Sequence, residues 1–274
     1  MKRSFFIITL ITVCIAIISC SKKSGNEPDP ATGGNEELSK ALLRRITMNP
    51  GTDVDGTFQY NNDSTVSHIR YTSPLVSTLV NFHYSSPKWI DFIEDTRTND
   101  QADYFNDLKG RVHTILYSNP ISDISYQCEF VYAGAGKLTE MRFYWVENSI
   151  PSLKYINAYE YNSDGLLIKV TSTDSNWNTI EYTLSEYSDP CNFNPWLFIE
   201  PARLVDLYEL LNYPVLSSQN RLPGKVIKST SAGVERIIVQ QFTIEKGRLN
   251  KVKVSNKFPG AIGLDNTYDM NLYY

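Results

Sequence analysis

Two tryptophans, Trp177 and Trp196, lie in turn-like segments of the sequence rather than in its strand-like runs. Trp177 is flanked by polar residues in the stretch Asp-Ser-Asn-Trp-Asn, which is typical of a hairpin tip. An indole exposed at a tip can stack on a sugar ring or contact a partner protein. Trp196 follows Pro195 in a loop whose prolines exclude a central strand, where it could bind a ligand or pin the segment that follows. Both are candidate binding residues.

Side chains that could catalyse a reaction are present but dispersed. The three histidines, His68, His83 and His113, each stand alone in a strand-like run, whereas a metal site needs several converging donors. Acidic residues are numerous, yet sequence alone shows no pair placed across a cleft as in a glycosidase. No motif for nucleotide, zinc or serine chemistry occurs. The sequence therefore predicts no catalytic residue, no metal site and no cofactor.

The cysteines allow two interpretations. Of the four cysteines, Cys128 and Cys191 lie in the body of the chain and far apart in sequence. An oxidising compartment would permit a disulfide between them, while a buried thiol in a strand is at least as common. The sequence leaves both alternatives open.

The N-terminus has the pattern of a leader. Lys2 and Arg3 precede an uncharged apolar run over residues 5–18, which is shorter than the roughly 20 residues that span a bilayer and is typical of a signal peptide. The run ends in Ile-Ile-Ser-Cys, which resembles a bacterial lipobox. That resemblance implies cleavage before Cys20 and acylation of Cys20, so that the chain would be held at a membrane by its lipid. The alternative is an ordinary secretory signal that happens to end in cysteine.

Composition predicts the rest of the domain organisation. We interpret residues 1–19 as the lipoprotein signal peptide, 20–37 as the lipidated cysteine and a polar, Gly- and Pro-rich tether, and 38–274 as one β-rich domain.

The chain has 26 basic and 30 acidic residues and no basic cluster, which argues against nucleic acid as a partner. The expected location is the cell envelope, at the outer membrane, with its face left open.

One phrase recurs along the chain. In residues 159–170, Tyr-Glu-Tyr runs into Asn-Ser-Asp-Gly, and an apolar strand-like run follows. Asn, Asp and Gly tolerate the left-handed backbone of tight hairpins, so each phrase predicts a hairpin. Gly110, Gly136 and Gly165 recur at near-equal intervals, and Gly224 follows after about twice that interval, which indicates an internal repeat.

Two segments depart from this phrase. Residues 201–211 place Leu204, Leu207 and Leu211 on one helical face, so we expect a short helix that caps or plugs an open end of the sheet. Residues 38–48 fit either a helix face or a strand, and we favour the strand.

These observations predict the fold class. The strand-like runs number roughly 15 and are joined by short links, which favours an antiparallel meander. A sheet of more than about ten strands curls or splits, so we predict an all-β fold curled into a barrel-like sheet with one short helix insert. A two-layer β-sandwich or an open twisted sheet is the alternative. Charged residues in the strands, among them Glu140 and Lys169, argue against a membrane-spanning barrel.

The repeated phrase, together with the helical segment before Leu222-Pro223 and the lipobox, resembles Bacteroidetes lipoproteins of domain of unknown function 4595. The residues of the phrase that carry the resemblance are Tyr159, Tyr161, Gly165, Leu167 and Val170. The resemblance covers most of the chain after residue 19 and implies a porin-like fold. It implies no site residues, because that family has no assigned activity.

The function that these features favour is a non-enzymatic, lipid-anchored binding or structural module of the cell envelope, with a glycan or a protein as partner. A second hypothesis is a carrier that holds an apolar ligand inside a closed barrel. A third is a hydrolase of polysaccharide or peptide, which would need two carboxylates converging in one cleft.

Overall fold

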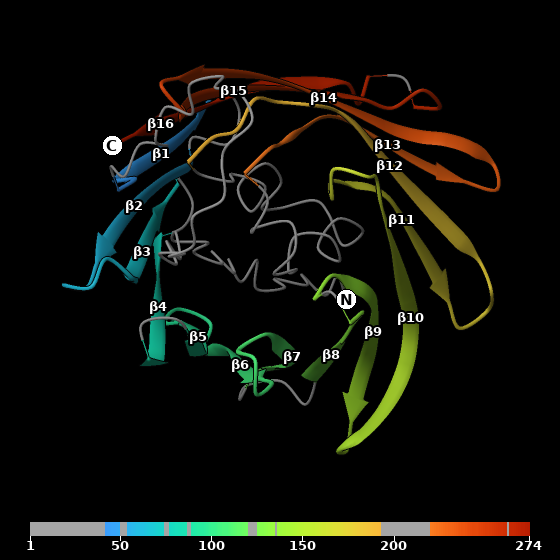
Figure 1. The fold of residues 1–274 in the computed structure, drawn as a ribbon, viewed down its shortest axis with the longest axis horizontal. Coiled ribbons are helices and arrows are strands. Elements are labelled where there is room, and N and C mark those ends of the chain that lie inside the picture. The colour runs from blue at the N-terminus through green and yellow to red at the C-terminus, as the bar shows by residue number, and fades with distance from the viewer. Residues whose placement is uncertain are drawn as a thin grey trace, which may run out of the picture.

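The computed structural model describes residues 42–49, 54–73, 77–86, 89–119, 125–134, 136–192, 220–261 and 263–274. The described residues form sixteen strands in one antiparallel sheet that closes into a barrel (Figure 1). The strands are β1 Arg45–Asn49, β2 Val54–Tyr60, β3 Val66–Thr72, β4 Ser77–Ser86, β5 Trp89–Asp95, β6 Asp100–Asn106, β7 Val112–Ser118, β8 Ser125–Tyr132, β9 Leu138–Glu147, β10 Ile150–Tyr161, β11 Leu167–Asp174, β12 Thr179–Tyr187, β13 Pro223–Thr230, β14 Gly233–Glu245, β15 Arg248–Lys257 and β16 Asn266–Tyr273.

The predicted all-β antiparallel meander is confirmed, and the sheet closes rather than staying open or splitting into a sandwich. The expected helix at 201–211 lies outside the described residues, as do Cys20, Trp196, the signal peptide and the tether. No helix in the described ranges is long and apolar enough to cross a membrane.

Closure depends on one pairing between the two ends of the described chain. β1 pairs antiparallel with β16, from Arg45 opposite Tyr273 to Asn49 opposite Asp269, and every other strand pairs with its neighbours in sequence. Residues 45–49 thus form a strand, which is the alternative that we favoured for the segment 38–48. Since each strand has two partners, the barrel exposes no strand edge to other chains.

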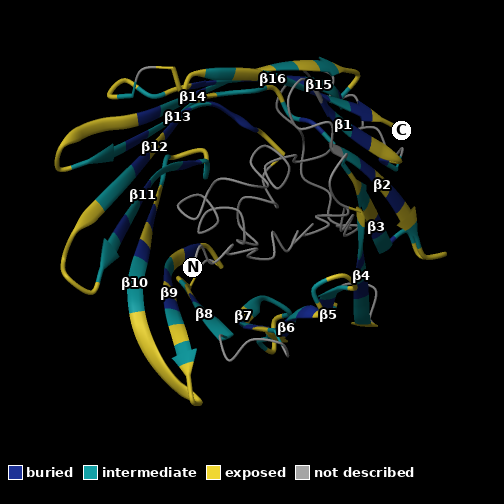
Figure 2. Ribbon diagram, turned by 180° about the vertical axis from the view of Figure 1, so that it is seen from behind, coloured by how far each residue is buried: buried dark blue, intermediate teal, exposed yellow. Residues whose placement is uncertain are grey.

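The two faces of the closed sheet differ in chemistry. Along β15, Val252, Val254 and Asn256 are buried while Lys253 between them is exposed, and Figure 2 shows buried and exposed positions on strands all around the barrel. A single closed sheet shields its concave side, so the buried residues face inward and the alternate residues face outward. The inner face is mostly apolar, and the outer face carries ion pairs such as Lys169–Glu181 at 2.7 Å.

Five hairpin turns share one hydrogen-bonding pattern, at 61–65, 107–111, 133–137, 162–166 and 174–178. In each, the first residue donates its N–H to the carbonyl of the fifth, and the fourth donates to the carbonyl of the first. The fourth residue always has a positive φ, and in three turns it is Gly110, Gly136 or Gly165. The predicted turn role of these three glycines is confirmed.

Gly224, which the spacing groups with these glycines, does not share their role. Gly224 lies within β13 and is not among the positive-φ residues. A Cβ at this position would stand 2.5 Å from the carbonyl oxygen of Glu186. Glycine is therefore required here by the close approach of the neighbouring strand.

Tyrosines at the ends of five strands fasten neighbouring strands together. Each hydroxyl donates to a main-chain carbonyl at the beginning of the preceding strand: Tyr60 to Leu43 (2.5 Å), Tyr132 to Val112 (2.7 Å), Tyr161 to Leu138 (2.9 Å), Tyr187 to Leu167, and Tyr274 to Leu249 (2.9 Å). The strands concerned all end at the same end of the barrel. The recurring tyrosine of the phrase is thus a structural clasp.

Replacing a clasp tyrosine by phenylalanine should destabilise the barrel. In Tyr161→Phe the Leu138 carbonyl loses its tyrosine donor, which costs about 1 kcal/mol, measured as a lower urea midpoint. Tyr273→Phe, at a half-exposed position on β16, is the control and should leave the midpoint unchanged. Equal stability of Tyr161→Phe and the wild type would contradict the clasp.

Stability should also fall at alkaline pH. Burial raises the pKa of Tyr60 to about 12 and raises the pKa values of Tyr161 and Tyr187 well above the ordinary value. An unfolded tyrosine has a pKa of about 10, so above that pH the unfolded chain loses protons that the folded chain keeps. The stabilisation is complete below pH ~10 and is lost as pH rises through about 12. Urea midpoints between pH 8 and 11 test this, and a flat profile would contradict it.

Candidate binding site on the barrel rim

Trp177 stands at the tip of the hairpin that joins β11 to β12. The Asp174 carboxylate organises this turn by accepting hydrogen bonds from the main-chain N–H groups of Asn176 (2.8 Å) and Asn178 (2.9 Å). The side-chain and main-chain hydrogen bonds from Asn178 lower the pKa of Asp174. Trp177 is 86% exposed. The predicted hairpin tip with an exposed indole is therefore confirmed.

Trp177 occupies the position that other turns of this type give to a small residue. Its φ is 65°, and the equivalent residues are Ser64, Gly110, Gly136 and Gly165. A residue with a Cβ pays roughly 1–2 kcal/mol for the left-handed conformation, and a bulky residue there is an outlier. The indole is thus presented to solvent at a conformational cost.

Other exposed apolar side chains lie at the same end of the barrel, on β9 and β10. Tyr155 of β10 pairs with Phe143 of β9 on one side and with Asp174, the last residue of β11, on the other. Beyond this row β9 and β10 continue as a two-stranded overhang, and the beginning of β10 is exposed (Figure 2). This overhang carries exposed apolar residues and a lysine whose ammonium lies 5.0 Å from the centroid of the Trp145 ring. We define the rim cluster as Trp145, Ile150, Leu153, Lys154 and Trp177.

A main-chain hydrogen bond joins the two parts of the rim cluster. Ser175, in the Trp177 turn, donates its N–H to the carbonyl of Lys154 on β10 at 3.0 Å. The tip of the β11–β12 hairpin is therefore held against the β9–β10 overhang. The two tryptophans belong to one end of the barrel, opposite to the end fastened by the tyrosine clasps.

Buried and partly buried aromatic rings pack against Trp145. Tyr126 packs edge-on against Trp145, with ring centroids 6.1 Å apart, and stacks on Phe143 at 5.6 Å. Phe143 in turn stacks on Tyr155 at 4.6 Å. Aromatic pairs at such separations hold their geometry, so Trp145 is fixed while 43% of its surface stays exposed. Trp145 is not among the candidates that the sequence indicates, because strand alternation does not show where a strand extends beyond its neighbours.

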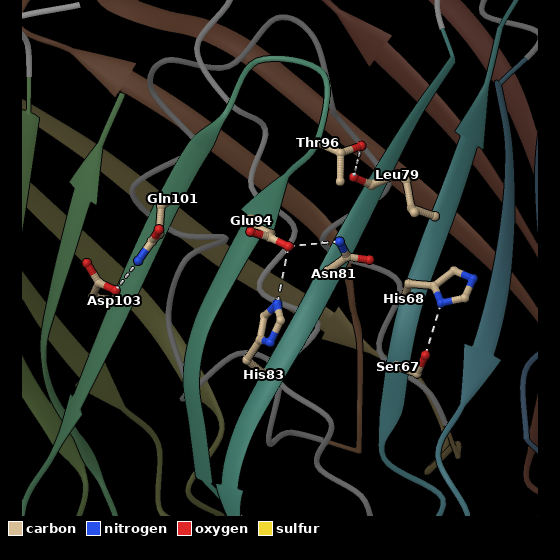
Figure 3. A network of polar contacts seen from close by, with 9 residues as sticks. All are labelled: Ser67, His68, Leu79, Asn81, His83, Glu94, Thr96, Gln101 and Asp103. Carbon is tan, nitrogen blue, oxygen red and sulfur yellow. Dashed lines mark hydrogen bonds and ion pairs between the residues drawn. The ribbon is translucent and has the colours of Figure 1, made fainter. Parts of the chain in front are cut away.

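Polar side chains also gather on the outer wall of β3 to β6 (Figure 3). Asn81 donates to Glu94 at 2.9 Å, and His83 Nε2 lies 3.3 Å from the same carboxylate oxygen. The hydrogen bond from Asn81, followed by that of His83, lowers the pKa of Glu94. His83 also stacks on Phe92 at 3.9 Å. In the described residues this histidine–carboxylate pair contacts an amide and a ring rather than a nucleophile, which suits a surface network better than catalysis.

The two cysteines in the body of the chain do not form a disulfide. Cys128 on β8 and Cys191 after β12 are buried thiols. In the described part of the chain, no group of three or more His, Cys, Asp or Glu side chains could hold a metal ion.

The chain is thus a single-chain closed antiparallel β-barrel with a polar outer wall and an aromatic rim. Its fold is similar to that of a porin-like protein from Bacteroides uniformis, with a TM-score of 0.57 and 13% identity over 84% of this chain and 96% of that chain. A porin-like protein from Bacteroides vulgatus gives a TM-score of 0.56 and 12% identity over 85% of this chain and 98% of that chain. No family model and no curated protein matches the sequence. The likeness shows the fold, and membership of domain of unknown function 4595 stays a prediction.

Substitutions at the positive-φ position of two equivalent turns test whether the backbone of Trp177 is strained. Trp177→Gly should leave stability unchanged or raise it by up to about 1 kcal/mol, because relief of the left-handed conformation offsets the added freedom of the unfolded chain. Gly165→Ala, at the same position of the β10–β11 turn, should lose about 1 kcal/mol. Urea unfolding measures both. A large loss of stability in Trp177→Gly would show that the indole serves packing.

Proposed function

We propose that this protein is a non-enzymatic binding module of the cell envelope and that its rim cluster binds a glycan. The observation that carries the proposal is Trp177, which is almost fully exposed in a backbone conformation that disfavours it. Conformational strain of this kind concentrates at functional sites. A solvent-exposed indole that stabilises no packing has its use in contact with another molecule.

The chemistry around Trp177 favours a glycan over a protein partner. The exposed faces of Trp145 and Trp177 offer flat apolar surfaces for the C–H faces of sugar rings. The two turns at this end of the barrel also carry short exposed polar side chains, Ser149 in the β9–β10 turn and Ser175 and Asn176 in the Trp177 turn, which can exchange hydrogen bonds with hydroxyl groups. A protein-binding surface of stable size would instead need a larger continuous apolar core.

The proposed location rests on the N-terminal sequence and on the outer wall. The lipobox cysteine Cys20 and the tether would hold the barrel at a membrane, which we propose to be the outer membrane. The outer wall carries cross-strand ion pairs such as Lys251–Asp269 at 2.6 Å and Lys169–Glu181 at 2.7 Å. Charges in the middle of strands disfavour contact with lipid, so these pairs support a barrel that stands in water beside its membrane.

A second candidate function is carriage of an apolar ligand inside the barrel. The observation in its favour is the inner face, where most buried positions, among them Ile69, Ile93 and Val252, are apolar. Closed barrels with apolar linings hold small ligands in other proteins. The third hypothesis, a hydrolase, has no support from converging carboxylates among the described residues.

A glycan array followed by titration of the best ligand tests the rim. We expect the full chain to bind one class of glycan, and Trp177→Gly to weaken that binding by about tenfold or more, the effect of losing one aromatic contact. Trp145→Ala should weaken it similarly.

The matched control is Leu108→Ala. Leu108 is a fully exposed apolar residue in the β6–β7 turn, at the opposite end of the barrel, and its removal should not affect binding. Binding that survives loss of both tryptophans would contradict the proposed site, and capture of a protein instead of a glycan would contradict the proposed ligand.

A further inference from the structure

The inner wall of β13–β16 interrupts the apolar lining with polar side chains. Arg236, Gln240 and Asn256 are buried, and Asn266 and Tyr268 face inward beside them on β16. We call these five residues the inner polar patch. Their positions follow from the register, in which Gln240 lies opposite Val254 and Val254 opposite Tyr268, with Asn256 opposite Asn266 in the next row.

Gln240 and Tyr268 have buried polar atoms with no hydrogen bond in the described residues. Gln240 is 5% exposed, and neither its amide nitrogen nor its amide oxygen has a partner. The hydroxyl of Tyr268 is likewise buried without one. Nearly all buried polar groups in native proteins are satisfied, so unsatisfied atoms in one row of the sheet, on either side of Val254 of β15, call for a ligand.

A buried guanidinium lies beside them and is held in place. Arg236 Nη2 donates to Asn256 Oδ1 at 2.8 Å, and Asn256 donates to Asn266 at 2.8 Å. The guanidinium also stands 5.1 Å from the centroid of the Phe258 ring. Burial lowers the pKa of Arg236 to about 10, and the neighbouring phenols of Tyr268 and Tyr182 act against that shift. The patch therefore combines a positioned positive charge with a phenol and an amide that can both donate.

Most of the surroundings of the patch are apolar, apart from Lys228, which lies opposite Arg236 on β13 and pairs with Glu235 at 3.0 Å. Ile238 lies between Arg236 and Gln240 on β14, and Val226, Val254 and Met270 occupy inward positions on the neighbouring strands; all four are buried. A ligand that accepts hydrogen bonds from the patch needs a pair of anionic oxygens at one end. A ligand that also packs against the apolar side chains needs a hydrocarbon body.

We propose that the inner polar patch binds the carboxylate of a long-chain apolar acid, with Gln240 and Tyr268 donating hydrogen bonds and Arg236 supplying the positive charge. This inference rests on the second candidate function, carriage inside the barrel, and is independent of the rim cluster. It specifies the chemical class of the carried molecule.

Titration of the full chain, first freed of co-purified lipid, with oleate tests the proposal. Oleyl alcohol has the same body without the carboxylate, and acetate has the carboxylate without the body. We expect oleate to bind about tenfold or more tightly than oleyl alcohol, since hydrogen bonds to a charged group are lost with the alcohol, and acetate to show no measurable binding.

Gln240→Leu gives a readout that a structural role would not. It should weaken oleate binding about tenfold, leave oleyl alcohol binding unchanged, and raise the urea midpoint of the ligand-free protein, because an unsatisfied buried amide is replaced by an apolar side chain of similar size. Tyr268→Phe should weaken oleate binding in the same direction. Gln241→Leu, on the exposed face of the same strand, is the matched control and should not change oleate binding.

The outcomes separate the site from the function. Equal binding of oleate and oleyl alcohol, or full oleate affinity in Gln240→Leu, would overturn the carboxylate site while carriage stood. Failure of both oleate and oleyl alcohol to bind would overturn carriage itself and the site with it.

Discussion

The pairing of β1 with β16 is the constraint on which the rest of this structure depends. It brings together residues 45–49 and 266–273, the two ends of the described chain. Ordering so long a stretch of chain before this contact forms costs entropy, and the closed sheet has no edges left to pair with other molecules. Arg45 reinforces the joint by bonding Asp55 of β2 at 2.9 Å and lying 5.9 Å from the ring of Tyr273.

Closure also gives the barrel its two unlike ends. At one end, tyrosine hydroxyls and glycine turns fasten consecutive strands closely. At the other, β9 and β10 extend beyond their neighbours and the β11–β12 turn carries a tryptophan. The end with the tyrosine clasps is regular, as expected of a scaffold. The end with the overhang and Trp177 departs from that pattern, as expected of the proposed binding surface.

Much of this could be predicted from local sequence. Hairpin turns depend on residues that tolerate a positive φ, so Gly110, Gly136 and Gly165 marked their turns correctly. A meander with so many strands has to curl, which predicted the barrel. Gly224 misled because a glycine demanded by a close strand looks, in sequence, like a glycine demanded by a turn. The exposure of Trp145 and the inner polar patch were beyond reach for a different reason, since both depend on register between strands that no local pattern records.

The central claim is that the end of the barrel bearing Trp145 and Trp177 is the surface that meets the ligand. The most direct measurement is a two-dimensional NMR titration that follows the indole N–H signals of the tryptophans. The glycan that binds most tightly in the array is added stepwise. The account predicts that the signals of Trp177 and Trp145 shift in step with saturation, while that of Trp89 on β5, which contacts Gly110 at the opposite end, stays in place. Shifts at Trp89 with Trp177 and Trp145 unmoved would contradict it.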